Sequence, residues 1–192
     1  MNKIQIIEEL VPKSLADKIE EAFLHDDTDW NLAKGCGGYK DVLVKDLKNV
    51  KDTPQMYHSL VSDNQPKTPL TSLALCVLFF LEDKTGVFPS YISRAKANLL
   101  FPLFDNSQQF HPPHIDTENP KSLTLVYYVS DSDGPTRLFD REGNVTHKIE
   151  PKKGSGVLFP STLVHSSSCP IYNQRRIVIN YVFEPKSLDK WH

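Results

Sequence analysis

The spacing of apolar residues along the chain changes from a helical to a strand period near its midpoint. The first half predicts two amphipathic helices: one opens with Ser14 as its N-cap, and the other opens at Pro69 and ends at Gly86. We expect each helix to bury one face against a sheet. The residues expected on these faces are Leu15, Ile19, Ala22 and Phe23 in the first helix and Leu73, Cys76, Val77 and Phe80 in the second.

The second half of the chain predicts a succession of short strands. From Tyr91 to Asn98, polar and apolar residues alternate, which places Arg94, Lys96 and Asn98 on one face of a strand. Turn sequences separate the strands that follow. These are expected at about 109–115, 122–130, 136–140, 145–149, 156–160, 163–168 and 176–183. Many short strands at this spacing indicate a sandwich or a jelly roll.

Length and composition fit one soluble domain of 192 residues, with 39% hydrophobic and 24% charged residues. We predict a single domain over 1–192, in which 1–90 supply helical support and loops and 91–184 form the core. Within the first part, the mostly polar residues 41–68 are expected to wrap the surface. The sequence has no signal-peptide core and no apolar run near the ~20 residues of a membrane span, so a cytoplasmic location is expected.

Two further features of the chain leave their roles open. The three cysteines are scattered without a C-x-x-C pair, which favours free thiols. A glycine-rich stretch at 35–38 is either a mobile loop over an active site or an ordinary surface connection. The net charge of −2 argues weakly against a broad nucleic-acid surface.

The most informative candidate site begins with His114 and Asp116, which are spaced i, i+2. In extended backbone such residues point to the same side. A third ligand from a distant strand, for which His165 is the candidate, would complete a set of two histidines and one carboxylate. This set leaves the opposite side of a metal open, as non-haem Fe(II) oxygenases require. An isolated H-x-D triplet is weak evidence, because such triplets occur by chance.

The order of the motifs strengthens this interpretation, because it resembles that of the 2-oxoglutarate- and Fe(II)-dependent dioxygenases, and among them the prolyl-4-hydroxylase-like branch. The resemblance covers roughly residues 91 to 184 and implies a mainly β fold, the double-stranded β-helix. This is a distorted jelly roll with the N-terminal helices packed outside. The pieces that match in order are the H-x-D triplet, 126–129, 133–136, 151–154, 157–160, His165 and the two arginines that head the last strand.

The resemblance also implies a reaction. Fe(II) would be held by His114, Asp116 and His165, with 2-oxoglutarate and O2 as co-substrates. Decarboxylation of 2-oxoglutarate to succinate and CO2 would accompany hydroxylation of the substrate, which the branch suggests is a prolyl or other peptidyl group. The partner of the protein would accordingly be a substrate peptide, a substrate protein or a small molecule.

The contacts with 2-oxoglutarate are likewise inferred by resemblance. The first tyrosine of the pair Tyr127 and Tyr128 would donate its hydroxyl to the distal carboxylate, and a basic residue would bind the same group. Only one of Arg175 and Arg176 can point inward, because neighbouring side chains of a strand face opposite ways. The family places a small polar residue near the metal, four positions after the basic one. Asn180 fits that position only when counted from Arg176.

Several alternatives stay open at this point. The substrate could be a nucleic-acid base or a small metabolite, the fold could be a catalytically silent binding module, or the ligands could hold another metal, as in cupin-like isomerases. The stretch 101–104 lacks the tyrosine that many prolyl-hydroxylase-like relatives carry there. His111 is expected outside the ligand set. The histidines expected to face solvent are His25, His58, His147 and His192.

Overall fold

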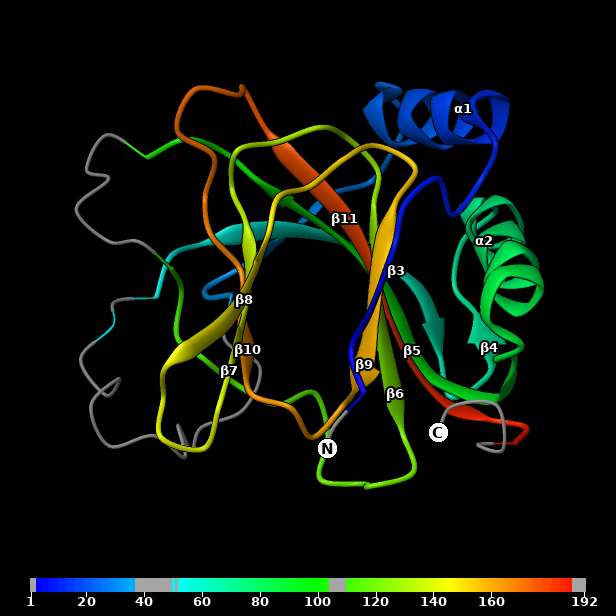
Figure 1. Cartoon of the computed structure of the whole chain (residues 1–192). Coiled ribbons are helices and arrows are strands. Elements are labelled where there is room, and N and C mark those ends of the chain that lie inside the picture. Colours follow the sequence, from blue (N-terminus) through cyan, green and yellow to red (C-terminus); the bar gives the residue numbers. More distant parts are fainter. Residues whose placement is uncertain (1–2, 37–49, 51, 104–109, 188–192) are drawn as a thin grey trace.

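The computed structural model describes residues 3–36, 50, 52–103 and 110–187, which form two antiparallel sheets and two helices (Figure 1). The larger sheet has eight strands in the order β1-β9-β6-β11-β5-β3-β2, with β4 paired to β3, and the smaller has the order β10-β7-β8. The strands are β1 Gln5–Ile7, β2 Asn31–Ala33, β3 Gln55–Ser62, β4 Gln65–Pro66, β5 Pro89–Leu100, β6 Leu123–Tyr128, β7 Thr136–Phe139, β8 Val145–Ile149, β9 Gly156–Pro160, β10 His165–Ser166 and β11 Arg176–Pro185.

The two sheets face each other, and a bridge between His114 and His165 adds one more extended segment beside β10 (Figure 1). Apolar side chains from both sheets, including Val126, Leu138 and Phe159, pack between them. Two antiparallel sheets that enclose a shared interior form a jelly roll. The predicted mainly β class is therefore confirmed, with the helices on the outside.

The helices α1 (Lys13–Leu24) and α2 (Leu70–Thr85) cover the outer face of the larger sheet (Figure 1). They form one apolar core with the outward-facing side chains of β5, β6 and β11. The buried residues of the helices are Ala16, Ile19 and Phe23 in α1 and Thr71, Ala74, Val77, Leu78 and Leu81 in α2. This face of α2 is rotated from the predicted stripe, of which only Val77 is fully buried.

The predicted helix ends are partly correct. Gly86 ends α2 in the left-handed conformation, at φ 71°, and its N–H donates to the Glu82 carbonyl. Ser14 is not the N-cap of α1, because the helix already begins at Lys13 and Pro12 precedes it without a side-chain cap. Proline at the start of a helix costs no hydrogen bond, since its missing N–H would have no helical partner there.

The prediction that residues 41–68 wrap the surface is wrong for β3, which pairs with β5 inside the larger sheet. The strand was hard to recognise because a register shift lies between Ser59 and Val61 and polar residues occupy much of it. His58 is buried, not solvent-facing: its Nδ1 lies 2.7 Å from the Asp29 carbonyl and its Nε2 lies 2.9 Å from Thr68 Oγ1. Residues 1–90 thus supply strands as well as helices and loops.

The later strands lie where the sequence predicts them, but two segments are shorter than predicted. Of the predicted strand 163–168, only β10 (His165–Ser166) forms. Between residues 110 and 115, only His114 makes a β-bridge, where a longer strand was predicted. Among the described residues, no helix is long and apolar enough to cross a membrane.

The core of the outer layer generates a stability prediction. Leu81 in α2 has no exposed surface, whereas Leu32 in β2 is 70% exposed. We expect Leu81→Ala to lower the free energy of unfolding by about 2–5 kcal/mol, because the buried site cannot refill the lost volume. Leu32→Ala, the same chemical change at the surface, should stay within about 0.5 kcal/mol. Urea denaturation of both variants measures the difference, and equal losses would contradict this account of the core.

Candidate active site

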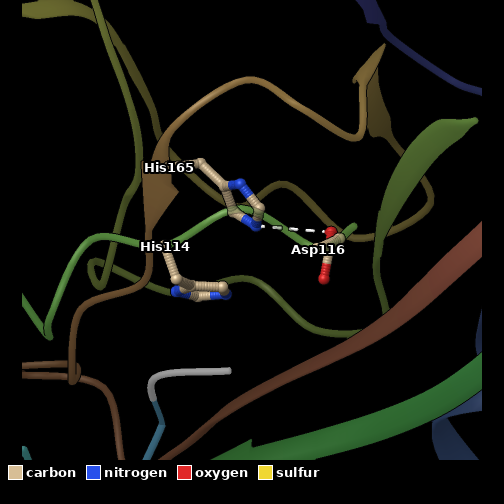
Figure 2. A group of neighbouring side chains, drawn as sticks. All are labelled: His114, Asp116 and His165. Carbon is tan, nitrogen blue, oxygen red and sulfur yellow. Dashed lines mark ion pairs between the residues drawn. The ribbon is translucent and has the colours of Figure 1, made fainter. Parts of the chain in front are cut away.

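The structure brings His114, Asp116 and His165 together, with their side chains converging on one place (Figure 2). The bridge fixes the two histidines, since each backbone N–H donates to the other's carbonyl at 2.9 Å. Asp116 follows in a bend and is held by its N–H to the Ser161 carbonyl at 3.0 Å. The candidate ligand atoms of the three side chains all lie within 4.8 Å of one another.

Backbone carbonyls determine which nitrogen each histidine offers. Nδ1 of His114 lies 3.2 Å from the Pro112 carbonyl, and Nδ1 of His165 lies 2.9 Å from the Leu163 carbonyl. A carbonyl can only accept, so Nδ1 carries a proton in both rings, and Nε2 is the nitrogen that remains for a metal. Burial, reinforced by His165, lowers the pKa of His114 to about 4. Neutral imidazoles with a free Nε2 are the form that binds a metal.

The carboxylate of Asp116 is buried and fixed through both oxygens. Oδ1 accepts hydrogen bonds from Arg94 at 2.5 Å and from Asn180 at 3.4 Å, and Oδ2 accepts one from Thr124 at 2.7 Å. Burial alone would raise the pKa of Asp116, but the neighbouring charges of His165 and Arg94 outweigh it and lower the pKa below its usual value. The group is therefore an ionised, oriented oxygen ligand.

This donor set fits Fe(II). Two imidazole nitrogens and one carboxylate oxygen converge beside a cavity of about 290 Å³. Such a set occupies one side of a transition metal and leaves the other side for exchangeable ligands. The residue types, their protonation and their spacing therefore all suit the metal that the sequence suggested.

Arg176 points into the same cavity, as the register argument predicts, and Arg175 points away from it. Arg176 is only 2% exposed. Its Nε donates to the Gly134 carbonyl at 2.7 Å, and its Nη2 donates to Thr136 Oγ1 at 2.9 Å. Among the described residues, no carboxylate lies within ion-pair distance of it. A buried cation without a protein counter-charge is costly, so it indicates a site for an external anion.

The predicted orientation of Tyr127 is wrong. In the antiparallel pairing of β6 with β11, Tyr127 lies opposite Ile179, and both belong to the outer core beneath the helices. Tyr128 lies opposite Val178 on the inner face, where its hydroxyl donates to Thr136 Oγ1 at 3.0 Å. The tyrosine associated with the Arg176 site is therefore the second of the pair.

Other predicted positions are also resolved. Asn180 faces the cavity beside Asp116, while His111 is buried outside the ligand set, with Nε2 2.9 Å from Thr53 Oγ1. Gly35 and Cys36 line the cavity, but the rest of the glycine-rich stretch, 37–38, lies outside the described residues, so the lid stays a prediction.

Sequence reasoning missed Thr124 and Thr136, which bind Asp116 and Arg176. Both threonines lie in predicted strands, so their presence in the sheets was predictable. Which face of the strand each one occupies became known only from the strand pairing.

Comparison with known proteins identifies the family of the region that carries the site. Residues 101–184 match the model of the 2OG-Fe(II) oxygenase superfamily. This region of the chain belongs to the superfamily, which confirms the predicted resemblance. Its cofactors are accordingly Fe(II) and 2-oxoglutarate, with O2 as co-substrate, as the sequence predicted. No curated protein sequence matches the chain.

Solved structures support the fold of this oxygenase across nearly its whole length. A Pseudomonas putida prolyl-4-hydroxylase is 15% identical, with a TM-score of 0.62, covering 97% of this chain and 95% of that one. The viral collagen prolyl hydroxylase of Paramecium Bursaria Chlorella virus-1 is 15% identical, with a TM-score of 0.53, covering 93% and 94%. The epimerase SnoN in complex with Fe3+, alpha ketoglutarate and nogalamycin RO is 10% identical, with a TM-score of 0.60, covering 95% and 79%.

The arrangement of the three side chains generates a prediction about metal binding. His114→Ala and Asp116→Ala should each weaken anaerobic Fe(II) binding by on the order of a hundredfold or more. The reason is that removing a metal ligand lowers the affinity more than removing a hydrogen-bonding partner of that ligand. His25→Ala, a change at an exposed histidine, should bind Fe(II) normally. Calorimetry with Fe(II) under argon measures all three. Unchanged binding in both ligand variants would overturn the assignment.

Proposed function

We propose that this oxygenase hydroxylates its substrate at a metal centre held by His114, Asp116 and His165, with Arg176 as the anchor of 2-oxoglutarate. The observation that carries the proposal is the buried Arg176 guanidinium, which faces the same cavity as the three candidate ligands and has no carboxylate partner among the described residues. A dicarboxylate that reaches from the metal to Arg176 would bind the metal with one carboxylate and pair with the guanidinium through the other.

When bound, Fe(II) and 2-oxoglutarate supply the activation of O2, by which 2-oxoglutarate becomes succinate and CO2 and the substrate gains a hydroxyl. The residues of the chain contribute orientation and charge. Thr124 and Arg94 hold Asp116 in one rotamer, and the two backbone carbonyls hold the imidazoles. A ligand set that is fixed before the metal arrives lowers the cost of organising the site.

Thr136 has a specific role in the proposed 2-oxoglutarate site. Its Oγ1 accepts hydrogen bonds from both Arg176 and Tyr128. Because a hydroxyl has two acceptor sites and one proton, both acceptor sites are occupied and the proton remains for an incoming acceptor. Burial raises the pKa of Tyr128 to about 12, which keeps its hydroxyl protonated as the donor. Arg176 and Thr136 together therefore offer a carboxylate one cation and one hydroxyl donor.

The substrate is the finer part of the proposal. A prolyl or other peptidyl group, predicted from the motif order, is supported by the likeness to the Pseudomonas putida and viral prolyl hydroxylases, which at 15% identity extends to the fold. A small molecule is the alternative, and the likeness to SnoN gives it comparable support. The excess of cationic over anionic side chains in the cavity favours an anionic small molecule over a neutral prolyl peptide.

One assay tests the proposed chemistry while the substrate is still unidentified. The purified protein, loaded with Fe(II), is given 2-oxoglutarate and O2, and succinate is quantified alone and with peptides, oligonucleotides and free amino acids. We expect iron-dependent succinate formation that one substrate class increases. If no condition yields iron-dependent succinate, the chain is a silent binding module and the proposed function is wrong.

The two adjacent arginines provide a sharper prediction about the anchor. Arg176→Ala should weaken 2-oxoglutarate binding by roughly thirtyfold or more, equivalent to about 2–5 kcal/mol, because the buried carboxylate loses a charge-assisted partner. Arg175→Ala removes the same charge from a side chain turned away from the cavity and should change binding by less than about 0.5 kcal/mol. Anaerobic titration of both variants with 2-oxoglutarate measures the difference. If Arg175→Ala loses affinity for 2-oxoglutarate and Arg176→Ala keeps it, the assigned register is off by one residue and Arg175 is the anchor.

A further inference from the structure

A second group of cations lines the cavity away from Arg176. Arg94 and Lys96 lie on the inner face of β5, and Lys96 pairs across the sheet with Asn180 of β11. Asn180 in turn contacts Asp116. These cations therefore lie at the metal end of the cavity.

Lys96 lacks the ion pair that its neighbour has. Arg94 is bound to Asp116, whereas no carboxylate of the described residues lies within ion-pair distance of Lys96. The half-buried ammonium lies 5.5 Å from the centre of the Tyr57 ring. Burial lowers the pKa of Lys96, and the nearby Arg94 lowers it further. Both effects would be relieved by an anion beside the ammonium.

Unsatisfied polar atoms gather in the same wall. Four buried side-chain N or O atoms of the described residues have no hydrogen-bond partner, and three of them belong to cavity residues: Arg94 Nε, Asn98 Oδ1 and Asn180 Oδ1. A buried polar atom without a partner costs about 1–3 kcal/mol, so such atoms rarely cluster by chance. One donor and two acceptors beside a free cation form a polar site without an occupant from the protein.

The cations of Arg176 and Lys96 are held in different surroundings. The Arg176 guanidinium is bound to Thr136 of β7, whereas the Lys96 ammonium lies against the Tyr57 ring of β3. Lys96 also pairs with Asn180, which is four residues, or roughly 13 Å of strand, from Arg176 on β11. A cosubstrate anchored at Arg176 therefore leaves the surroundings of Lys96 to another ligand.

The charge balance of the cavity also calls for another anion. The ionised residues that line it among the described ones are Arg94, Lys96, Arg176 and Asp116, which sum to +2 (three positive, one negative). Fe(II) adds two positive charges and 2-oxoglutarate adds two negative ones, so the loaded cavity retains the excess. An anionic substrate would neutralise this excess, whereas a neutral prolyl peptide would leave it.

We propose that the substrate of this oxygenase is a small carboxylic acid whose carboxylate binds Lys96, with Arg94, Asn98 and Asn180 binding its other polar groups. This inference rests on the proposed function and narrows its substrate class. The amide oxygens of Asn98 and Asn180 can accept hydrogen bonds from hydroxyl or N–H groups elsewhere on the acid. A cavity of about 290 Å³, shared with the cosubstrate, suits a small molecule.

The test compares acids with their amides, which have nearly the same shape but lack the negative charge of the carboxylate. The protein is saturated with Fe(II) and 2-oxoglutarate under argon, which blocks the Arg176 site and prevents turnover. Binding is then measured by ligand-observed NMR for L-proline and L-prolinamide, L-leucine and L-leucinamide, pentanoate and pentanamide, and N-acetylated aspartyl and asparaginyl peptide amides. We expect at least one free acid to bind about tenfold or more tightly than its amide.

Substitutions then assign the preference to Lys96. Lys96→Met should abolish the discrimination between acid and amide, and Lys96→Arg should retain it. Lys121→Met removes the same charge at an exposed position and should leave the preference intact. The affinity of Lys96→Met for 2-oxoglutarate, titrated separately, should remain within about twofold of the parent value. A large loss would make Lys96 part of the cosubstrate site and overturn the proposal.

The remaining outcomes are also decisive. Equal binding of every acid and amide by the unsubstituted protein overturns the proposal without reference to any variant, as does discrimination that persists in Lys96→Met. A preference confined to the aspartyl peptide would replace the small acid by an acidic peptide. If the protein forms iron-dependent succinate but shows no acid preference, this inference fails and the proposed function stands. If it binds neither Fe(II) nor 2-oxoglutarate, the proposed function itself fails.

Discussion

The alternation of side chains along β11 is the constraint on which both the core and the active site depend. Ile177, Ile179 and Tyr181 pack into the outer core under the helices, while Arg176 and Asn180 face the cavity. A shift of one residue would exchange the two sets, burying a guanidinium among apolar side chains and exposing aliphatic ones to the cavity. The apolar outer face thereby holds the inner face in register, so stability and site geometry are set by the same strand.

The buried guanidinium of Arg176 also shapes the loop that receives it. Gly134 offers its carbonyl to Nε, and a Cβ at this glycine would come within 2.6 Å of the Ser168 carbonyl oxygen. Only glycine therefore allows the backbone to approach this closely. The Asp133-Gly134-Pro135-Thr136 motif carries two contacts of the arginine, one from a backbone carbonyl and one from the Thr136 hydroxyl. The short turn before this strand thus has a physical reason in the arginine that it supports.

The sequence predicted the features that depend on local spacing and left out those that depend on pairing between strands. The i, i+2 spacing was sufficient to bring His114 and Asp116 to one side. Alternation was sufficient to place Arg94, Lys96 and Asn98 on the same face of β5. The inner face of β6 could not be derived in the same way. Whether Tyr127 or Tyr128 faces Arg176 depends on the register of β6 against β11, which no local pattern encodes. For that reason, the assignment of Tyr127 from the family resemblance was wrong.

The interior of the protein has the opposite electrostatic character from the chain as a whole. The chain carries a net charge of −2, whereas the cavity is lined by more cationic than anionic side chains. A positive cleft between low-dielectric walls concentrates its field at the opening, and an acidic exterior does not compete for anions. This positive charge lies at two separate positions, Arg176 at one end of the cavity and Lys96 at the other. Because 2-oxoglutarate needs only the cation at Arg176, the cation at Lys96 indicates that the molecule to be hydroxylated is itself an anion.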